Sequence, residues 1–134
     1  MPRHPRRLTD AGITPARYAE LQYVCRQYPD YKRRIRNARA GITDPPARTS
    51  GAWKLPDPTG NRAAALVDAT ARDTERVRLI ESCARDCAPP GLTRAILHSV
   101  TTGDNYENLH PPCGINYFYE ARLLFFILLD ARLP

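Results

Sequence analysis

The chain has 134 residues, enough for one domain whose hydrophobic core needs no metal or disulfide to fold. Its first ten residues are polar, so no secretory signal is visible, and we expect the four cysteines to be reduced thiols of a cytosolic protein. The longest apolar run, residues 123–129, is far shorter than the roughly 20 residues that cross a bilayer. Length and composition therefore argue against a disulfide scaffold and a membrane-spanning chain.

The formal net charge of +6 is unevenly distributed. Residues 1–50 contain 11 Lys or Arg and 4 Asp or Glu, a balance of +7, whereas residues 51–134 contain 9 and 10, a balance of −1. A concentrated positive field attracts nucleic acid or an acidic protein surface, through an attraction that salt weakens. The charge pattern indicates a polyanionic partner without choosing between these two classes.

The chain begins with a segment that we expect to be a flexible basic arm, residues 1–13, followed by a single helical domain over residues 14–134. Thr14 is a good N-cap, and Pro15 then occupies the first helical position, where its missing N–H costs nothing. These two residues predict a helix that ends near Gln27.

Pro29 is expected to break that helix, and a second helix is expected from about Tyr31 to Ala40, ending at Gly41. Together the two helices would form a basic helical hairpin over residues 14–41. Five basic side chains fall within eight positions of the second helix without an acidic one: Lys32, Arg33, Arg34, Arg36 and Arg39. A charge run is usually a solvated face, yet this density favours contact with nucleic-acid phosphates or an acidic surface.

Residues 42–57 have no usable period and two adjacent prolines, so we expect a loop. A long helix is predicted over residues 58–87, with Asp57 as its cap and Pro58 in its first turn. Its expected buried stripe consists of Val77, Ile80, Cys83 and Cys87.

Three short helices are predicted over residues 92–131: Leu92 to Thr101 ending at Gly103, a very short one at YENLH, and Ile115 to Ala131. The expected fold class is all-α, with about six helices. The order of the last three is that of a helix-turn-helix unit, whose final helix can lie in the major groove of DNA. However, the segment from Ala88 onward has a charge balance of −1, which is poor for an element that approaches phosphates.

Other chemistry has weaker support. The histidines lie outside any recognised nucleophile or base motif and the glycines are scattered, so we expect neither catalysis nor a cofactor. Four side chains could suit a tetrahedral zinc ion, namely Cys83, Cys87, His110 and Cys113. Their spacing differs from the usual zinc knuckle and cysteine is often simply buried, so burial is the expected state and zinc the alternative.

Several short stretches, YPDYKRRI, DPTGNRAAAL, RLIESC, SVTTGDNYENL, PPCG, FYEAR and FFILLD, together resemble small proteins of Firmicutes temperate phages. Those proteins are grouped with the RinA and ArpU-like late-operon transcriptional regulators, and the likeness covers about residues 20–131. It implies that residues 104–109 form the second helix of a helix-turn-helix. The turn would be Pro112, Cys113 and Gly114, and the following helix would carry Tyr117, Phe118, Tyr119 and Arg122. The chain departs from the pattern at Leu123 and Leu124, where the relatives tend to have arginines.

Two functions follow as hypotheses, both for a protein in the cytoplasm of a bacterial host. The first is a phage-encoded DNA-binding regulator of late transcription. The second is a phage protein that inhibits a host nucleic-acid-handling enzyme, in the manner of an anti-CRISPR, through its basic face. The side chains expected to bind double-stranded DNA or an acidic partner are Arg3, Arg6, Arg7, Lys32, Arg33, Arg34, Arg36, Arg39, Asn116, Tyr117 and Arg122.

The apolar run near the C-terminus is expected to be the last helix, buried on one side. Because such a run cannot all face one core, part of it is expected to contact a partner or a second copy in a homodimer. The residues expected at that interface are Leu123, Leu124, Phe126 and Ile127.

Overall fold

The structure is a computed structural model that describes residues 7–43 and 58–134, with side chains from residues 7–40 and 67–134. Within the described ranges every regular element is helical and none is a strand, which confirms the all-α fold class. A 3-10 turn, η1 (Leu8–Ala11), precedes the α-helices, whose bounds are α1 Pro15–Arg26, α2 Tyr28–Thr43, α3 Pro58–Cys87, α4 Pro90–Thr102, α5 Tyr106–Leu109 and α6 Ile115–Arg132.

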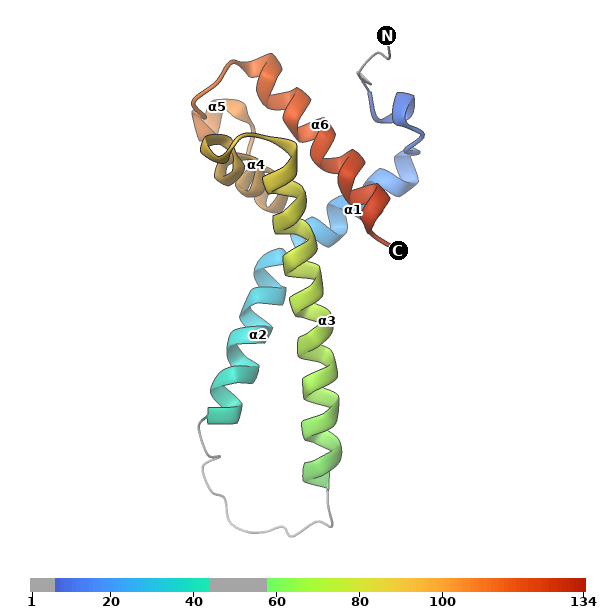
Figure 1. The fold of residues 1–134 in the computed structure, drawn as a ribbon, viewed down its shortest axis with the longest axis vertical. Helices are drawn as coiled ribbons and strands as arrows, with labels where there is room; N and C mark the ends of the chain where they lie inside the picture. Colours follow the sequence, from blue (N-terminus) through green and yellow to red (C-terminus); the bar gives the residue numbers. More distant parts are fainter. Residues whose placement is uncertain (1–6, 44–57) are drawn as a thin grey trace.

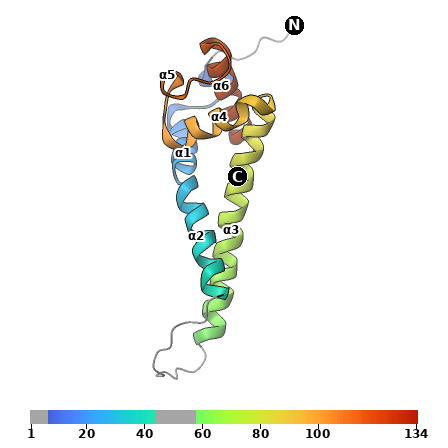
Figure 2. The ribbon, with the colours of Figure 1, turned by 90° about the vertical axis from the view of Figure 1, so that its left-hand side faces the viewer.

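The helices form two regions that we call the head and the stalk (Figure 1). The stalk consists of α2 and the part of α3 before Leu79, two helices that run side by side away from the rest of the molecule (Figures 1 and 2). The head contains η1, α1, α4, α5, α6 and the end of α3. The long helix α3 therefore belongs to both regions.

The chain is ordered earlier than the sequence suggests. Residues Leu8–Ala11 form η1, and Gly12 ends it in the left-handed conformation at φ 81°. Ile13 is only 2% exposed and belongs to the core of the head. The prediction of a flexible arm over residues 1–13 is thus wrong for residues 8–13, because one buried apolar side chain holds this segment against the body; residues 1–6 lie outside the described part.

The start of α1 is as predicted. The Thr14 side-chain oxygen accepts a hydrogen bond from the Arg17 N–H at 3.1 Å, and Pro15 follows in the first turn. Arg17 also connects α1 to the end of the chain, since its Nε lies 2.7 Å from Asp130 Oδ1 and its Nη2 donates to the Leu133 carbonyl. One guanidinium therefore bridges the start of α1 and the C-terminal end of the chain.

The bounds of α2 differ from the prediction at both ends. The helix begins at Tyr28 rather than Tyr31, because Gln27 keeps a right-handed helical backbone and Pro29 falls in the first turn, where proline is tolerated. It continues through Gly41 to Thr43, since glycine lowers helix stability by only about 1 kcal/mol and does not by itself end a helix. Residues 42 and 43 of the expected loop are therefore helical, and residues 44–57, including Asp57, lie outside the described part.

The head encloses a core that draws on nearly all of its elements. Side chains with no more than 2% exposure come from the turn after η1, from α1, α3 and α4, and from α6: Ile13, Leu21, Cys25, Ile80, Cys83, Ala84, Ile96, Val100, Phe118, Phe125, Phe126 and Leu129. The α3 stripe predicted from the sequence is present, with Ile80, Cys83 and Cys87 buried and Val77 partly buried. A network of edge-to-face aromatic contacts, such as Tyr18 with Phe126 and Phe125 with Phe126, adds to this packing.

The apolar run 123–129 is more buried than expected. Helix α6 contacts η1, α1, α3 and α4, so apolar side chains pointing in several directions each find a neighbour. Phe126 is only 1% exposed and packs against Tyr18, which contradicts its assignment to a partner interface. Leu123 and Ile127 are partly buried, and Leu124, 41% exposed, is the most accessible of the four. The expected homodimer stays a prediction.

Candidate nucleic-acid interface

Charge is separated between the two regions. Residues 28–43 and 58–78, which build the stalk, contain nine basic and four acidic residues, a balance of +5. The head, residues 7–27 and 79–134, contains seven basic and eight acidic residues, a balance of −1. Almost the entire positive excess of the chain is therefore carried by two neighbouring helices.

Arg34 and Arg33 of α2 both form ion pairs within the chain. Arg34 makes two parallel hydrogen bonds to Asp73 on α3, Nε to Oδ2 and Nη2 to Oδ1, both 3.0 Å, and the Asp73 side chain is only 13% exposed. Arg33 pairs with Asp30 one turn earlier at 2.8 Å. Hence Arg34 links α2 to α3. Although the basic run itself contains no acidic residue, the fold places carboxylates from outside the run beside two of its arginines.

Lys32, Arg36 and Arg39 form what we call the basic stripe, defined by their exposure and their shared side of α2. They are all exposed and, at spacings of four and three residues, lie on one side of α2. Lys32 has its Nζ 5.3 Å from the centroid of the Tyr28 ring, while the Tyr28 hydroxyl donates to Glu81 on α3. Burial and this bond to a carboxylate raise the pKa of Tyr28, so the ring stays a neutral support for Lys32.

The predicted N-terminal contacts are only partly described. Arg3 and Arg6 lie outside the described residues. Arg7 is exposed at the start of η1, in the head. Arg7, the described one of these three arginines, therefore lies in a different region from the basic stripe, which is on the stalk.

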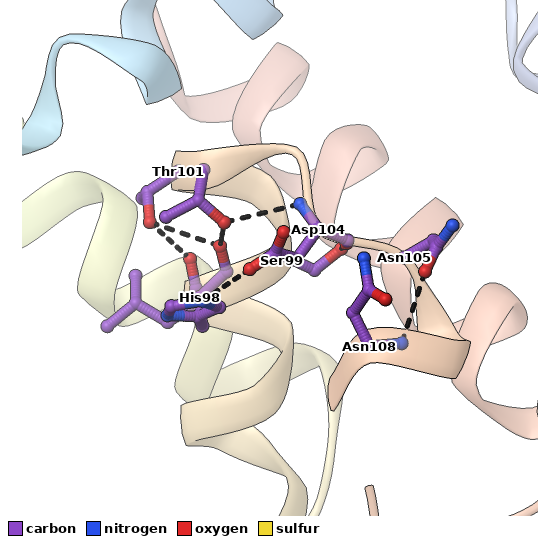
Figure 3. A network of polar contacts seen from close by, with 8 residues as sticks. His98, Ser99, Thr101, Asp104, Asn105 and Asn108 are labelled. Carbon is purple, nitrogen blue, oxygen red and sulfur yellow. Dashed lines mark hydrogen bonds and ion pairs between the residues drawn. The ribbon is translucent and has the colours of Figure 1, made fainter. Parts of the chain in front are cut away.

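The last three helices, α4, α5 and α6, follow one another in the predicted order, while their assignment as a helix-turn-helix stays a prediction. Gly103 ends α4 in the left-handed conformation at φ 87°, the Asn105 side chain accepts from the Asn108 N–H to cap α5, and His110 ends α5 at φ 47°. Further polar contacts hold the turn between α4 and α5 (Figure 3). His98 Nε2 lies 2.8 Å from Asp104 Oδ2, and the Ser99 hydroxyl donates to the Asp104 carbonyl at 2.7 Å.

The exposed start of α6 is aromatic and apolar rather than basic. Asn116 is exposed, and so are Ile115, Tyr117 and Tyr119. Tyr117 also borders an open depression of about 590 Å³, whose lining has no charged side chain: Pro89, Gly91, Leu92, Pro112, Cys113, Gly114 and Tyr117. This surface lacks the basic groups that would hold DNA phosphates, so DNA binding by this helix stays a prediction.

The four candidate zinc ligands do not converge. Among the described residues no group of three or more His, Cys, Asp or Glu side chains is placed to hold a metal ion. Cys83 and Cys87 are buried in the head, whereas Cys113 is partly exposed and His110 is exposed. Burial raises the pKa of the Cys25 and Cys87 thiols to about 12 and also raises that of Cys83, which makes these thiols neutral core residues.

The sequence missed the contacts that cross between helices. Asp73, the partner of Arg34, gave no signal in the sequence because 39 positions separate the two residues. The same holds for the Tyr28–Glu81 hydrogen bond across 53 positions. Arg26, at the end of α1, is a further basic residue that the sequence did not single out.

No described helix has the length and apolar character that a bilayer crossing demands. In comparisons with protein-family models, curated proteins and solved structures, the chain has no match.

Proposed function

We propose that this chain is a phage-encoded DNA-binding protein that regulates transcription, and that the stalk rather than the last helix holds the DNA backbone. The observation that carries the proposal is the exposed basic stripe Lys32, Arg36 and Arg39, on a region with a charge balance of +5. Such a surface gives affinity for phosphates whatever the base sequence. The resemblance to late-operon regulators agrees with this role and supplies the transcriptional part of it.

The exposed polar groups at the start of α6 would then supply any base-specific contact. Asn116 can accept from and donate to base edges, and Tyr117 can contact a thymine methyl group. Because basic groups are sparse there, the affinity depends mainly on the stalk, and discrimination between sequences is weak.

The proposal is tested by fluorescence anisotropy with a labelled DNA duplex of arbitrary sequence, titrated between about 50 and 200 mM salt. The wild-type chain should bind, and its affinity should fall steeply with salt. The double variant Lys32→Gln/Arg36→Gln removes two phosphate contacts. The negative slope of log K against log salt should therefore become shallower by about 2.

Arg85→Gln/Arg94→Gln is the matched control, because it removes the same charge from exposed positions in the head. It should leave the slope close to that of the wild type. An undetectable wild-type affinity at low salt, or equal slopes for the two double variants, would overturn the proposal.

The second candidate is an inhibitor that docks on a host nucleic-acid-handling enzyme. The observation that favours it is the exposed apolar and aromatic surface around Tyr117, beside a depression without charge, since such patches are typical of protein contacts. It predicts a stoichiometric protein complex that Tyr117→Ala weakens, together with little affinity for free DNA. A lysate pull-down that recovers only nucleic acid would count against it.

A further inference from the structure

The contact between α2 and α3 has two edges, each marked by a polar contact that crosses between the helices. On one edge Arg34 Nε and Nη2 are bonded to Asp73 at 3.0 Å, and on the other the Tyr28 hydroxyl donates to Glu81. Tyr28 and Arg34 are about 120° apart around α2, and Tyr31, only 7% exposed, lies midway between them. We call these two sides of the stalk the Tyr28 edge and the Arg34 edge.

The basic stripe lies on the Tyr28 edge. Lys32 is one turn beyond Tyr28, and its Nζ is 5.3 Å from the centroid of the Tyr28 ring. Arg36 is one further turn along the same side of α2, whereas Arg34 is about 200° around the helix from Lys32. The exposed cations of α2 and its ion pair with Asp73 therefore occupy different edges of the stalk.

Arg78 brings a cation of α3 to the same edge. It precedes Glu81 by three residues, so the two side chains are neighbours on one side of α3. The two helices run in opposite directions (Figures 1 and 2). One turn after Tyr28 in α2 and one turn before Glu81 in α3 therefore lead to about the same height of the stalk. Those two steps end at Lys32 and at Arg78.

Both cations are available to a ligand. Arg78 is exposed, Lys32 has its contact with the Tyr28 ring, and neither forms an ion pair with a residue that the structure describes. Glu81, the acid of this edge, accepts the hydrogen bond of Tyr28 and is not bonded to Arg78. Two cations at one height, one from each helix, favour an anion from outside because charge-assisted hydrogen bonds stabilise it.

We propose that Arg78 is a phosphate-binding residue of the stalk, so that the nucleic-acid backbone lies across the Tyr28 edge on both α2 and α3 rather than along α2 alone. This inference rests on the proposed function and adds a second helix to the interface. The axes of packed helices are about 8–10 Å apart, so Lys32 and Arg78 each bind their own phosphate. Loss of either side chain then removes one contact.

The test compares Arg78→Gln with Arg72→Gln in the salt titration of the same labelled duplex. Both variants remove one exposed arginine from the stalk part of α3, but Arg72 is about 180° around the helix from Glu81, whereas Arg78 is only about 60° from it. Arg78→Gln should make the negative slope of log K against log salt shallower by about 1. Arg72→Gln should change the slope far less, and Arg78→Lys should keep it because the charge is retained.

A second comparison looks for a gain of affinity, which a loss of folding cannot imitate. Glu81→Gln removes the negative charge from the Tyr28 edge, and its amide oxygen can still accept from the Tyr28 hydroxyl. The affinity should rise about twofold at low salt, the effect of one unit charge roughly 8 Å from a phosphate in water. Asp68→Asn is the control, because it removes the same charge from an exposed position about 140° away around α3.

The outcomes separate this inference from the proposed function. Equal slopes for the two arginine variants of α3, beside a shallower slope for Lys32→Gln/Arg36→Gln, would overturn the inference and leave the proposed function standing. A Glu81→Gln affinity no higher than that of its control would likewise place the phosphates away from this edge. Wild-type slopes for every stalk variant, or no binding by the wild-type chain, would overturn both.

Discussion

The head and the stalk differ in how they are held together and in what they present to solvent. The head has a core shared by nearly all of its elements, and several of its charges are paired within it, such as Arg17 with Asp130 and Arg132 with Asp86. The stalk is two helices wide, so each helix has one neighbour, and its residues carry most of the net positive charge of the chain. Folding stability is thus concentrated in one region and net positive charge in the other.

The helix α3 shows this division within a single element. Near its start Val67 is 59% exposed, whereas Ile80, Cys83 and Ala84 near its end have no exposed surface. An apolar residue in the stalk can meet only α2, but one in the head is surrounded by several helices. The comparison teaches that stability and charge can be altered separately in this protein.

The largest effect is expected from the head core. Phe125→Ala removes a fully buried ring and should lower the free energy of unfolding by about 3–5 kcal/mol, because the cavity it leaves closes only in part. Urea unfolding followed by circular dichroism measures this change. The neighbouring Leu124→Ala, on an exposed side chain, is the control and should cost far less.

If instead the two variants were equally destabilised, the head would not hold the stability of the chain. Hydrogen exchange refines the result, since Phe125→Ala should speed exchange at amides throughout the head.

An intermediate effect is expected from alkaline pH, which acts through the buried thiols of the head. Their folded-state pKa of about 12 lies above the ordinary value of 9.0, so the neutral form stabilises the fold fully below pH 9. Between pH 9 and about 12 the unfolded chain releases these protons while the folded chain keeps them. The free energy of unfolding should therefore fall by about 1.4 kcal/mol per pH unit for each thiol.

Urea unfolding at a series of alkaline pH values measures this slope. Cys25→Ala should make the slope shallower even if it also lowers the stability at neutral pH, whereas Cys113→Ala, on a partly exposed thiol, should leave the slope as it is. A slope that Cys25→Ala does not change would show that burial of this thiol has no linkage to folding.

The smallest effect is expected in the stalk. Asp73→Asn removes the charge that holds both nitrogens of Arg34 and should cost about 1 kcal/mol, since Arg34 is half exposed and solvent screens the pair. The loss should be local, with faster hydrogen exchange in α2 and little change in the head. Asp68→Asn, on an exposed residue of the same helix, is the control and should have almost no effect.

Faster exchange in the head of Asp73→Asn would mean that the two regions unfold as one unit. The variant also sharpens the binding hypothesis, because it releases Arg34 and adds one positive charge to the stalk. DNA affinity should then rise slightly while stalk order decreases.

Structural features that depend on neighbouring residues could be predicted from the sequence. Features that depend on contacts between distant residues could not. Thr14 with Pro15 and Gly103 fix helix ends through contacts within a few positions, and the structure has both ends as predicted. Pro29 and Gly41 were misinterpreted as helix ends because both residues are tolerated in a helix under particular local conditions.

The errors at the candidate site have one physical cause, namely that packing partners are far apart in the sequence. The sequence shows no acidic residue within the basic run of α2, but the fold places Asp73 of α3 beside Arg34. The apolar run of α6 was predicted to be buried on one side only. It is more buried because a distant residue, Tyr18 of α1, packs against Phe126.

The shared helix α3 has a geometric consequence. Its 30 residues span about 45 Å, and its last turns are fixed in the core while its first turns lie in the stalk. The direction of the stalk is therefore set by the way the last turns of α3 pack in the head. A substitution that repacks the head around the last turns of α3 would therefore also change where the basic stripe of α2 lies relative to the head.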